Sequence, residues 1–176
     1  MSHTKNATGE ARERMIFALS DMLTHTPIEN IIIKELCLRA QVNRSTFYRY
    51  YADQYDLLNQ VWCNLTQIYL DQVYQPQLSE YDALIQLLHF TQENRIIVIS
   101  VFRLVLLGRP LPDYADFVRT TLVDRCAKET APYLQSALVS IIYSWLIKKN
   151  PEPAGFIAQL MMDVAAGMQE SSAKLF

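Results

Sequence analysis

The sequence predicts an all-α protein: an N-terminal three-helix domain, a long connecting helix and a C-terminal helical bundle. Three observations support this fold. Apolar residues recur at helical spacing along the 176-residue chain, only 4 residues are glycine, and breakers divide the chain into segments of helix length. No segment shows a convincing strand pattern. Because 51% of the residues are hydrophobic, the chain can bury a sizeable core.

The N-terminal domain, residues 1–52, is expected to hold three helices. The first follows Thr8 or Gly9 and ends at about Thr24. The second covers about 33–40, and the third runs from Arg44 to Tyr50 or Tyr51. Asn43 precedes the third helix, and its side-chain oxygen suits a helix cap.

The second domain, residues 53–176, begins with the long connecting helix. Asp53 can cap this helix, Asp56 suits the positive end of its dipole, and Pro76 ends it after about Tyr74. The breakers that follow predict five more helices, at about 80–92, 94–107, 111–128, 131–149 and 153–173.

Composition excludes several classes of protein. The longest apolar run, Ile96 to Leu107, covers about twelve residues, whereas a bilayer span needs about 20. Residues 1–14 have no apolar core of a signal peptide, so we expect a soluble, cytoplasmic protein.

The sequence offers no group of residues suited to catalysis or to metal binding. The three cysteines, at 37, 63 and 126, have no metal-ligand spacing and fit ordinary buried positions better than a redox sensor. No nucleophile–base pair or phosphate-binding loop stands out either. We therefore expect no metal, no cofactor and no enzymatic activity.

Charge is distributed unevenly along the chain. The net charge is −2, yet residues 1–51 carry seven Lys or Arg against five Asp or Glu, and the rest of the chain is acidic. A mildly basic head on an acidic body is expected when only the head approaches phosphates.

The third helix, residues 44–51, separates two kinds of side chain. At about 100° per residue, Phe47 and Tyr51 share one face and can enter the core. The remaining side chains face outward or lie on the flanks: Arg44, Ser45, Thr46, Tyr48, Arg49 and Tyr50. Arginine can bind guanine in a bidentate way, and tyrosine hydroxyls suit phosphate oxygens. The pattern favours a DNA recognition helix over a small helical domain whose surface is merely basic and aromatic.

These residues also carry a resemblance to a known family. The stretches 12–18 and 33–51, the latter containing Val-Asn-Arg-Ser-Thr-Phe-Tyr-Arg-Tyr-Tyr, resemble the DNA-binding domain of TetR-family bacterial transcription regulators without a gap over about fifty residues. Leu57 and Leu58 follow as in the family. The resemblance implies a helix-turn-helix domain joined to a dimerisation and ligand-binding domain. It also implies DNA contacts from Lys34, Arg44, Ser45, Thr46, Tyr48, Arg49 and Tyr50.

Four positions depart from the family pattern. Gln41 replaces the turn glycine, Ile32 the threonine that opens helix two, Gln54 a lysine and Tyr50 a histidine. Losing the hydroxyl and the lysine removes two phosphate donors, which should weaken nonspecific binding and flatten its salt dependence.

The last two helices carry long apolar stripes. Part of each stripe must be the core of the bundle, but the last helix is apolar over more width than one face needs. The resemblance implies that both helices pair with their copies in a homodimer, which places two recognition helices about 34 Å apart on a palindromic operator. The expected interface residues are Leu138, Ile142, Trp145, Phe156, Leu160, Val164 and Met168.

The resemblance further implies a small-molecule effector site in the bundle. Candidate lining residues are Trp62, Tyr69, His89, Phe90, Phe102, Arg103, Phe117 and Tyr143. Arg103 more often pairs with a carboxylate or reaches water, and the bundle can instead respond to a protein partner. The favoured function is thus a ligand-responsive repressor, and the alternative is a coregulator that acts through a protein bound to its C-terminal domain.

Overall fold

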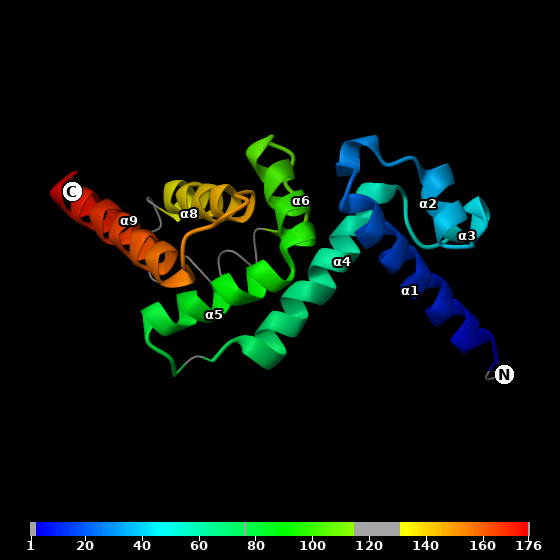
Figure 1. The fold of residues 1–176 in the computed structure, drawn as a ribbon, viewed down its shortest axis with the longest axis horizontal. Coiled ribbons are helices and arrows are strands. Elements are labelled where there is room, and N and C mark those ends of the chain that lie inside the picture. Colours follow the sequence, from blue (N-terminus) through cyan, green and yellow to red (C-terminus); the bar gives the residue numbers. More distant parts are fainter. Residues whose placement is uncertain (1–2, 76, 115–130, 176) are drawn as a thin grey trace. The chain divides into compact units, whose positions relative to one another are not determined.

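The computed structural model describes residues 3–75, 77–114 and 131–175, which form helices and turns without any strand among them (Figure 1). The predicted all-α class is therefore confirmed. The chain divides into two compact units, Met1–Cys63 and Asn64–Phe176. No helix in the described ranges is long and apolar enough to cross a membrane.

The first unit holds three helices, a 3-10 turn and the start of a fourth helix. Their bounds are α1 His3–Leu23, η1 Ile28–Asn30, α2 Ile33–Arg39, α3 Arg44–Tyr48 and α4 Gln54–Ile68. The side chains at the centre of this unit are fully buried: Met15, Leu19, Leu36, Phe47, Leu57 and Leu58. The apolar periodicity of the sequence thus corresponds to one core shared by all four helices.

Three local details of this unit differ from expectation. α1 begins at His3, because Gly9 costs a helix only about 1 kcal/mol and does not break it. α3 ends at Tyr48, although the amides of Tyr50 and Tyr51 still donate to the Phe47 carbonyl at 2.9 and 3.0 Å. Asn43 is the N-cap residue of α3, but its side chain makes no cap hydrogen bond. This end of α3 is exposed, so water can satisfy its amides at little cost.

The predicted cap of α4 is confirmed. Asp53 Oδ1 accepts hydrogen bonds from the amides of Tyr55 and Asp56 at 2.9 Å each, and Asp56 Oδ2 accepts one from the Ala52 amide at 2.9 Å. After Ile68 the helix widens into the π-helical turn η2, Tyr69–Val73. The Tyr74 amide donates to the Tyr69 carbonyl at 2.8 Å, so the segment ends where the sequence indicated. Pro76 lies outside the described residues.

The second unit contains α5 Glu80–Glu93, α6 Arg95–Leu106, α8 Ala131–Leu146 and α9 Ala154–Leu175. These bounds agree with the predicted helices within a few residues, whereas most of the helix predicted at 111–128 falls on residues the structure does not describe. α5 packs against α9, α6 against α8, and α8 against α9 (Figure 1). The α8–α9 connection is fixed by hydrogen bonds from Trp145 Nε1 to the Glu152 carbonyl, at 2.8 Å, and from Arg95 Nε to the Leu146 carbonyl, at 2.6 Å.

Two helices end in the same hydrogen-bonded turn but with different residues at its left-handed position. After α6, Gly108 has φ +71°, and the Arg109 amide donates to the Leu104 carbonyl at 2.8 Å. After α2, Gln41 has φ +53°, and the Val42 amide donates to the Cys37 carbonyl at 3.0 Å. Glycine adopts this conformation without strain, whereas a residue with a Cβ adopts it at a cost of about 1–2 kcal/mol.

We expect Gln41→Gly to raise the free energy of unfolding of the first unit by about 1 kcal/mol, because relief of the strained φ exceeds the entropy that glycine adds to the unfolded chain. The measurement is the hydrogen exchange of the backbone amides of buried residues in α1 and α2. Gln41→Ala is the matched control, since alanine keeps the Cβ and should give no gain. Equal protection in both variants would contradict the strain at this turn.

Candidate nucleic-acid interface

The short helix α3 has a buried back and an exposed front. Phe47 is fully buried and Tyr51 is 5% exposed, and their ring centroids lie 5.7 Å apart. Arg44, Ser45, Tyr48 and Arg49 are exposed, and Thr46 and Tyr50 are half-buried. The division into core-facing and outward-facing residues expected from the helical rotation is confirmed.

Arginines lie against the tyrosines of this segment. The Arg44 guanidinium lies 5.9 Å from the centre of the Tyr48 ring. Its hydrogen bond with Tyr48 raises the pKa of Arg44 further above its ordinary value, so this cation is permanent. Arg49 lies 4.9 Å from the centre of the Tyr50 ring, and its Nη2 donates to the Tyr50 hydroxyl at 3.1 Å. The outward face thus combines fixed positive charge with phenol groups.

Arg12 is part of this surface, and the sequence did not assign it a role. It belongs to α1, yet its guanidinium lies 4.7 Å from the centre of the Tyr50 ring. The only sequence signal was its place in a stretch with the family resemblance, because its proximity to Tyr50 comes from the packing of α1 on the other helices.

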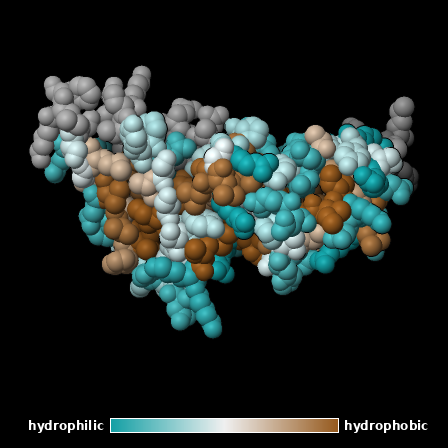
Figure 2. All heavy atoms as spheres, turned by 90° about the horizontal axis from the view of Figure 1, so that it is seen from above, coloured by the Kyte–Doolittle hydropathy of each residue, from teal (hydrophilic) through white to brown (hydrophobic). Residues whose placement is uncertain are grey.

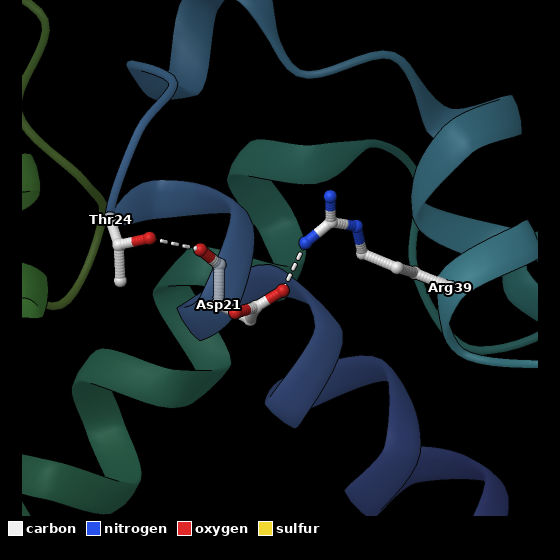
Figure 3. Close-up of polar contacts among 3 residues, drawn as sticks. All are labelled: Asp21, Thr24 and Arg39. Carbon is white, nitrogen blue, oxygen red and sulfur yellow. Dashed lines mark hydrogen bonds and ion pairs between the residues drawn. The ribbon is translucent and has the colours of Figure 1, made fainter.

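Two other arginines hold the frame of the first unit together. Arg14 Nε donates to the Ala40 carbonyl at 3.0 Å, which ties α1 to the end of α2. Arg39 forms an ion pair with Asp21 of α1, and the Thr24 hydroxyl donates to the Asp21 carbonyl at 2.6 Å (Figure 3). Arg39 and Asp21 are about half exposed, so the pair adds little stability. These two cations therefore serve the fold, and Arg12, Lys34, Arg44 and Arg49 supply the outward-facing charge.

The start of α2 lacks the features that bind a phosphate most tightly. Ile32 is its N-cap residue, is 55% exposed and offers no side-chain hydrogen bond. Lys34 is exposed in the first turn, and Gln54 is half-buried at the start of α4. The family pattern has a threonine hydroxyl at position 32 and a lysine at position 54. Of the groups near the start of α2 that suit a phosphate, this chain therefore keeps Lys34.

Cys37 lies on α2 and is buried. Burial raises the pKa of its thiol above the ordinary value, so the thiol stays protonated and unreactive. No three His, Cys, Asp or Glu side chains in the described parts of the chain gather in a way that could hold a metal ion.

The residues expected to line an effector site occupy different environments. Tyr69 and Phe90 are buried with ring centroids 5.0 Å apart, and Phe102 packs edge-on against Tyr114 at 6.0 Å. Trp62 is buried, but it belongs to the first unit. Of the others, Tyr143 is half-buried, whereas His89 and Arg103 are exposed and thus lie outside the apolar interior. Phe117 is not among the described residues.

The residues expected at a dimer interface also divide into two groups. Leu138, Ile142 and Trp145 of α8 are at most 3% exposed within the single chain, so they have no surface left for a partner. On α9, Phe156 is 58% and Leu160 38% exposed, while Val164 and Met168 are half-buried. Figure 2 shows hydrophobic surface over part of the second unit, at the left of the view.

Comparison with known proteins places the fold. No family model and no curated protein sequence matches the chain. Among solved structures, "Dihydroxyacetone kinase operon activator DhaS" matches with a TM-score of 0.52 and 16% sequence identity, over 91% of this chain and 96% of that one. At this identity the likeness shows the fold alone. The chain therefore shares the all-helical fold of that protein.

The second unit should lose stability at alkaline pH. Burial raises the pKa of Tyr69 and of Tyr114 to about 12, against an ordinary value of 10 that each regains on unfolding. Because the neutral phenols are favoured in the folded state, their contribution is complete below pH 10 and is lost as the pH rises towards 12. In unfolding curves measured across this range, Tyr69→Phe should show a shallower loss than the wild type. Tyr133→Phe changes a 72% exposed tyrosine and should leave the slope unchanged, so equal slopes for all three proteins would contradict the assignment.

Proposed function

We propose that this protein is a sequence-specific, DNA-binding transcriptional regulator that inserts α3 into the major groove. The observation that carries the proposal is the burial of Phe47 and Tyr51 behind an exposed face of Arg44, Ser45 and Arg49. Small hydroxyls let the backbone approach base edges, and guanidinium groups bind guanine or phosphate. Lys34, Thr46 and Tyr48 complete the proposed contact surface, and the Tyr50 ring lies against its arginines Arg12 and Arg49.

The protein acts in this proposal as a homodimer on a palindromic operator. A single five-residue helix reads few base pairs, and a two-fold pair reads two half-sites one turn of DNA apart. The apolar stripe of α9, in which Phe156 and Leu160 are exposed and Val164 and Met168 half-buried, is the proposed two-fold contact. Its exposure in the single chain supports this role, because exposed apolar stripes of this kind mark association surfaces.

We further propose that the dimer is a repressor whose affinity for DNA is set by a small-molecule effector bound in the second unit. Two aromatic pairs, Tyr69–Phe90 and Phe102–Tyr114, place phenol groups within its apolar interior. Apolar walls with a few polar groups are typical of effector sites.

A coregulator that needs a protein partner is the second candidate. The exposed, non-capping Ile32 favours it, because a head with fewer phosphate donors binds DNA less tightly alone.

Selection of genome fragments by the purified protein at low ionic strength should recover an operator. On that operator, Tyr48→Ala should lower the affinity for all sequences by a similar factor of about 10, since phosphate contacts carry no sequence information. Arg49→Ala should instead relax the preference at one base pair of each half-site, by about 1–3 kcal/mol. Competition binding with single-base operator variants separates the two patterns. If the protein selects no double-stranded site, with or without candidate partners, DNA recognition is refuted.

We expect Phe156→Glu to weaken dimerisation at least about 100-fold, because each copy loses a buried aromatic side chain worth roughly 1.5–3 kcal/mol. The residue is exposed in the single chain, so the variant should keep its helical circular dichroism. Sedimentation velocity measures the association. Gln159→Glu, an exposed α9 position with the same added charge, is the control. A Phe156→Glu protein that sediments as the wild-type dimer would place the contact elsewhere.

A further inference from the structure

Tyr50 lies at the junction of two arginines from different helices. The guanidinium carbons of Arg12, from α1, and Arg49, after α3, both lie within 4.9 Å of its ring centre. The Tyr50 hydroxyl also accepts a hydrogen bond from Arg49 Nη2 at 3.1 Å. One neutral side chain therefore contacts two outward-facing cations of the first unit.

The position of the Tyr50 ring is itself fixed by the core. Its centroid lies 6.3 Å from that of Tyr51, which is buried and packs on Phe47. Packing thus continues from the fully buried Phe47 through Tyr51 to the half-buried Tyr50, and from there to the two exposed arginines. A ring held in this way offers a fixed surface to side chains that would otherwise move freely.

Two arginines close together repel each other, and each loses side-chain entropy when it is ordered. The negative π-face of an aromatic ring attracts a cation by about 0.5–1 kcal/mol at an exposed site, which offsets part of both costs. Without the ring, the two guanidinium groups reduce their repulsion and regain side-chain entropy by moving apart into solvent. With it, two positive charges stay near one point before any ligand arrives.

We propose that Tyr50 is a positioning residue that pre-orders Arg12 for a DNA phosphate and Arg49 for a base edge, rather than a phosphate contact in its own right. This role rests on the DNA binding proposed above. Neighbouring phosphates of one strand are separated by about 3.4 Å along the helix axis, so a cluster of cations at the groove edge meets a dense row of acceptors. The ring links the backbone contact of α1 to the base contact of α3.

This positioning role predicts that removing the neutral Tyr50 ring will have the same effect on DNA binding as removing an arginine charge. Each phosphate neutralised adds about 0.9 to the slope of log K against log salt concentration, so Arg12→Gln should lower this slope by about 0.9 per half-site. Tyr50→Leu should lower the slope in the same direction and should also relax the base preference that Arg49→Ala relaxes. Tyr50→Phe keeps the ring and should bind within about threefold of the wild type.

Tyr55→Leu is the matched control, because it removes a half-buried tyrosine of the same unit that lies outside the proposed contact surface. It should leave the slope and the base preference unchanged. If Tyr50→Phe loses as much affinity as Tyr50→Leu, the hydroxyl itself binds DNA and the positioning role is overturned. An unchanged salt slope in Tyr50→Leu overturns it as well, while DNA binding by the wild type still stands.

A second measurement needs no DNA. In the free protein, the Arg12 and Arg49 δ-methylene protons should show ring-current shifts that persist in Tyr50→Phe and disappear in Tyr50→Leu. Arginine shifts that do not change in Tyr50→Leu would show that the ring does not order these side chains. If the arginines are ordered by the ring but the wild type binds no DNA, the proposed function fails and the positioning role fails with it.

Discussion

The burial of Phe47 is the constraint on which the candidate interface depends. α3 has only five residues, and isolated helices shorter than about 12–15 residues are marginal in water, so tertiary packing must hold it. Burying a phenylalanine side chain stabilises a fold by roughly 1.5–3 kcal/mol, and Tyr51 adds a second aromatic anchor on the same side. Once these two rings point inward, helical geometry leaves Ser45 and Arg49 outward. The surface that we assign to DNA is thus a consequence of the core beneath it.

The basic residues of the first unit divide according to what they bind. Arg14 and Arg39 use their donors on the Ala40 carbonyl and on Asp21, which fixes α2 against α1. Arg12 and Arg49 meet an aromatic ring instead, which leaves their charge uncompensated by any described carboxylate. Net charge alone does not separate these roles. A head that carries only two more basic than acidic residues can still present a concentrated positive surface, because Arg12 and Arg49 meet at one ring while Arg39 is paired with Asp21.

The sequence predicted the helices well, since apolar periodicity and proline or glycine breaks are local signals. It also predicted the two faces of α3, which follow from rotation per residue. It did not predict the contact of Arg12 with Tyr50, which depends on how α1 packs on the other helices of the first unit. It also predicted a cap from the Asn43 side chain that the structure does not contain, because an exposed helix end can leave its amides to water. For α8, the apolar periodicity identified which side chains are buried, but it could not tell whether the same chain or a partner buries them. Leu138, Ile142 and Trp145 are covered by their own chain.

This distinction between α8 and α9 bears on how the second unit can transmit a signal. α8 is packed into the core of its own chain. At its end, the Leu146 carbonyl accepts a hydrogen bond from Arg95 and the Trp145 indole donates one to the Glu152 carbonyl, so the start of α9 is fixed. α9 packs against both α8 and α5, and α5 carries Phe90, which meets Tyr69 of η2. A displacement of this aromatic pair therefore acts directly on a helix that supports the exposed stripe of α9. A ligand shifts such an equilibrium only by its difference in affinity between the two arrangements. Under the effector hypothesis proposed above, a repacked Tyr69–Phe90 contact between η2 and α5 is the difference that the ligand would have to recognise.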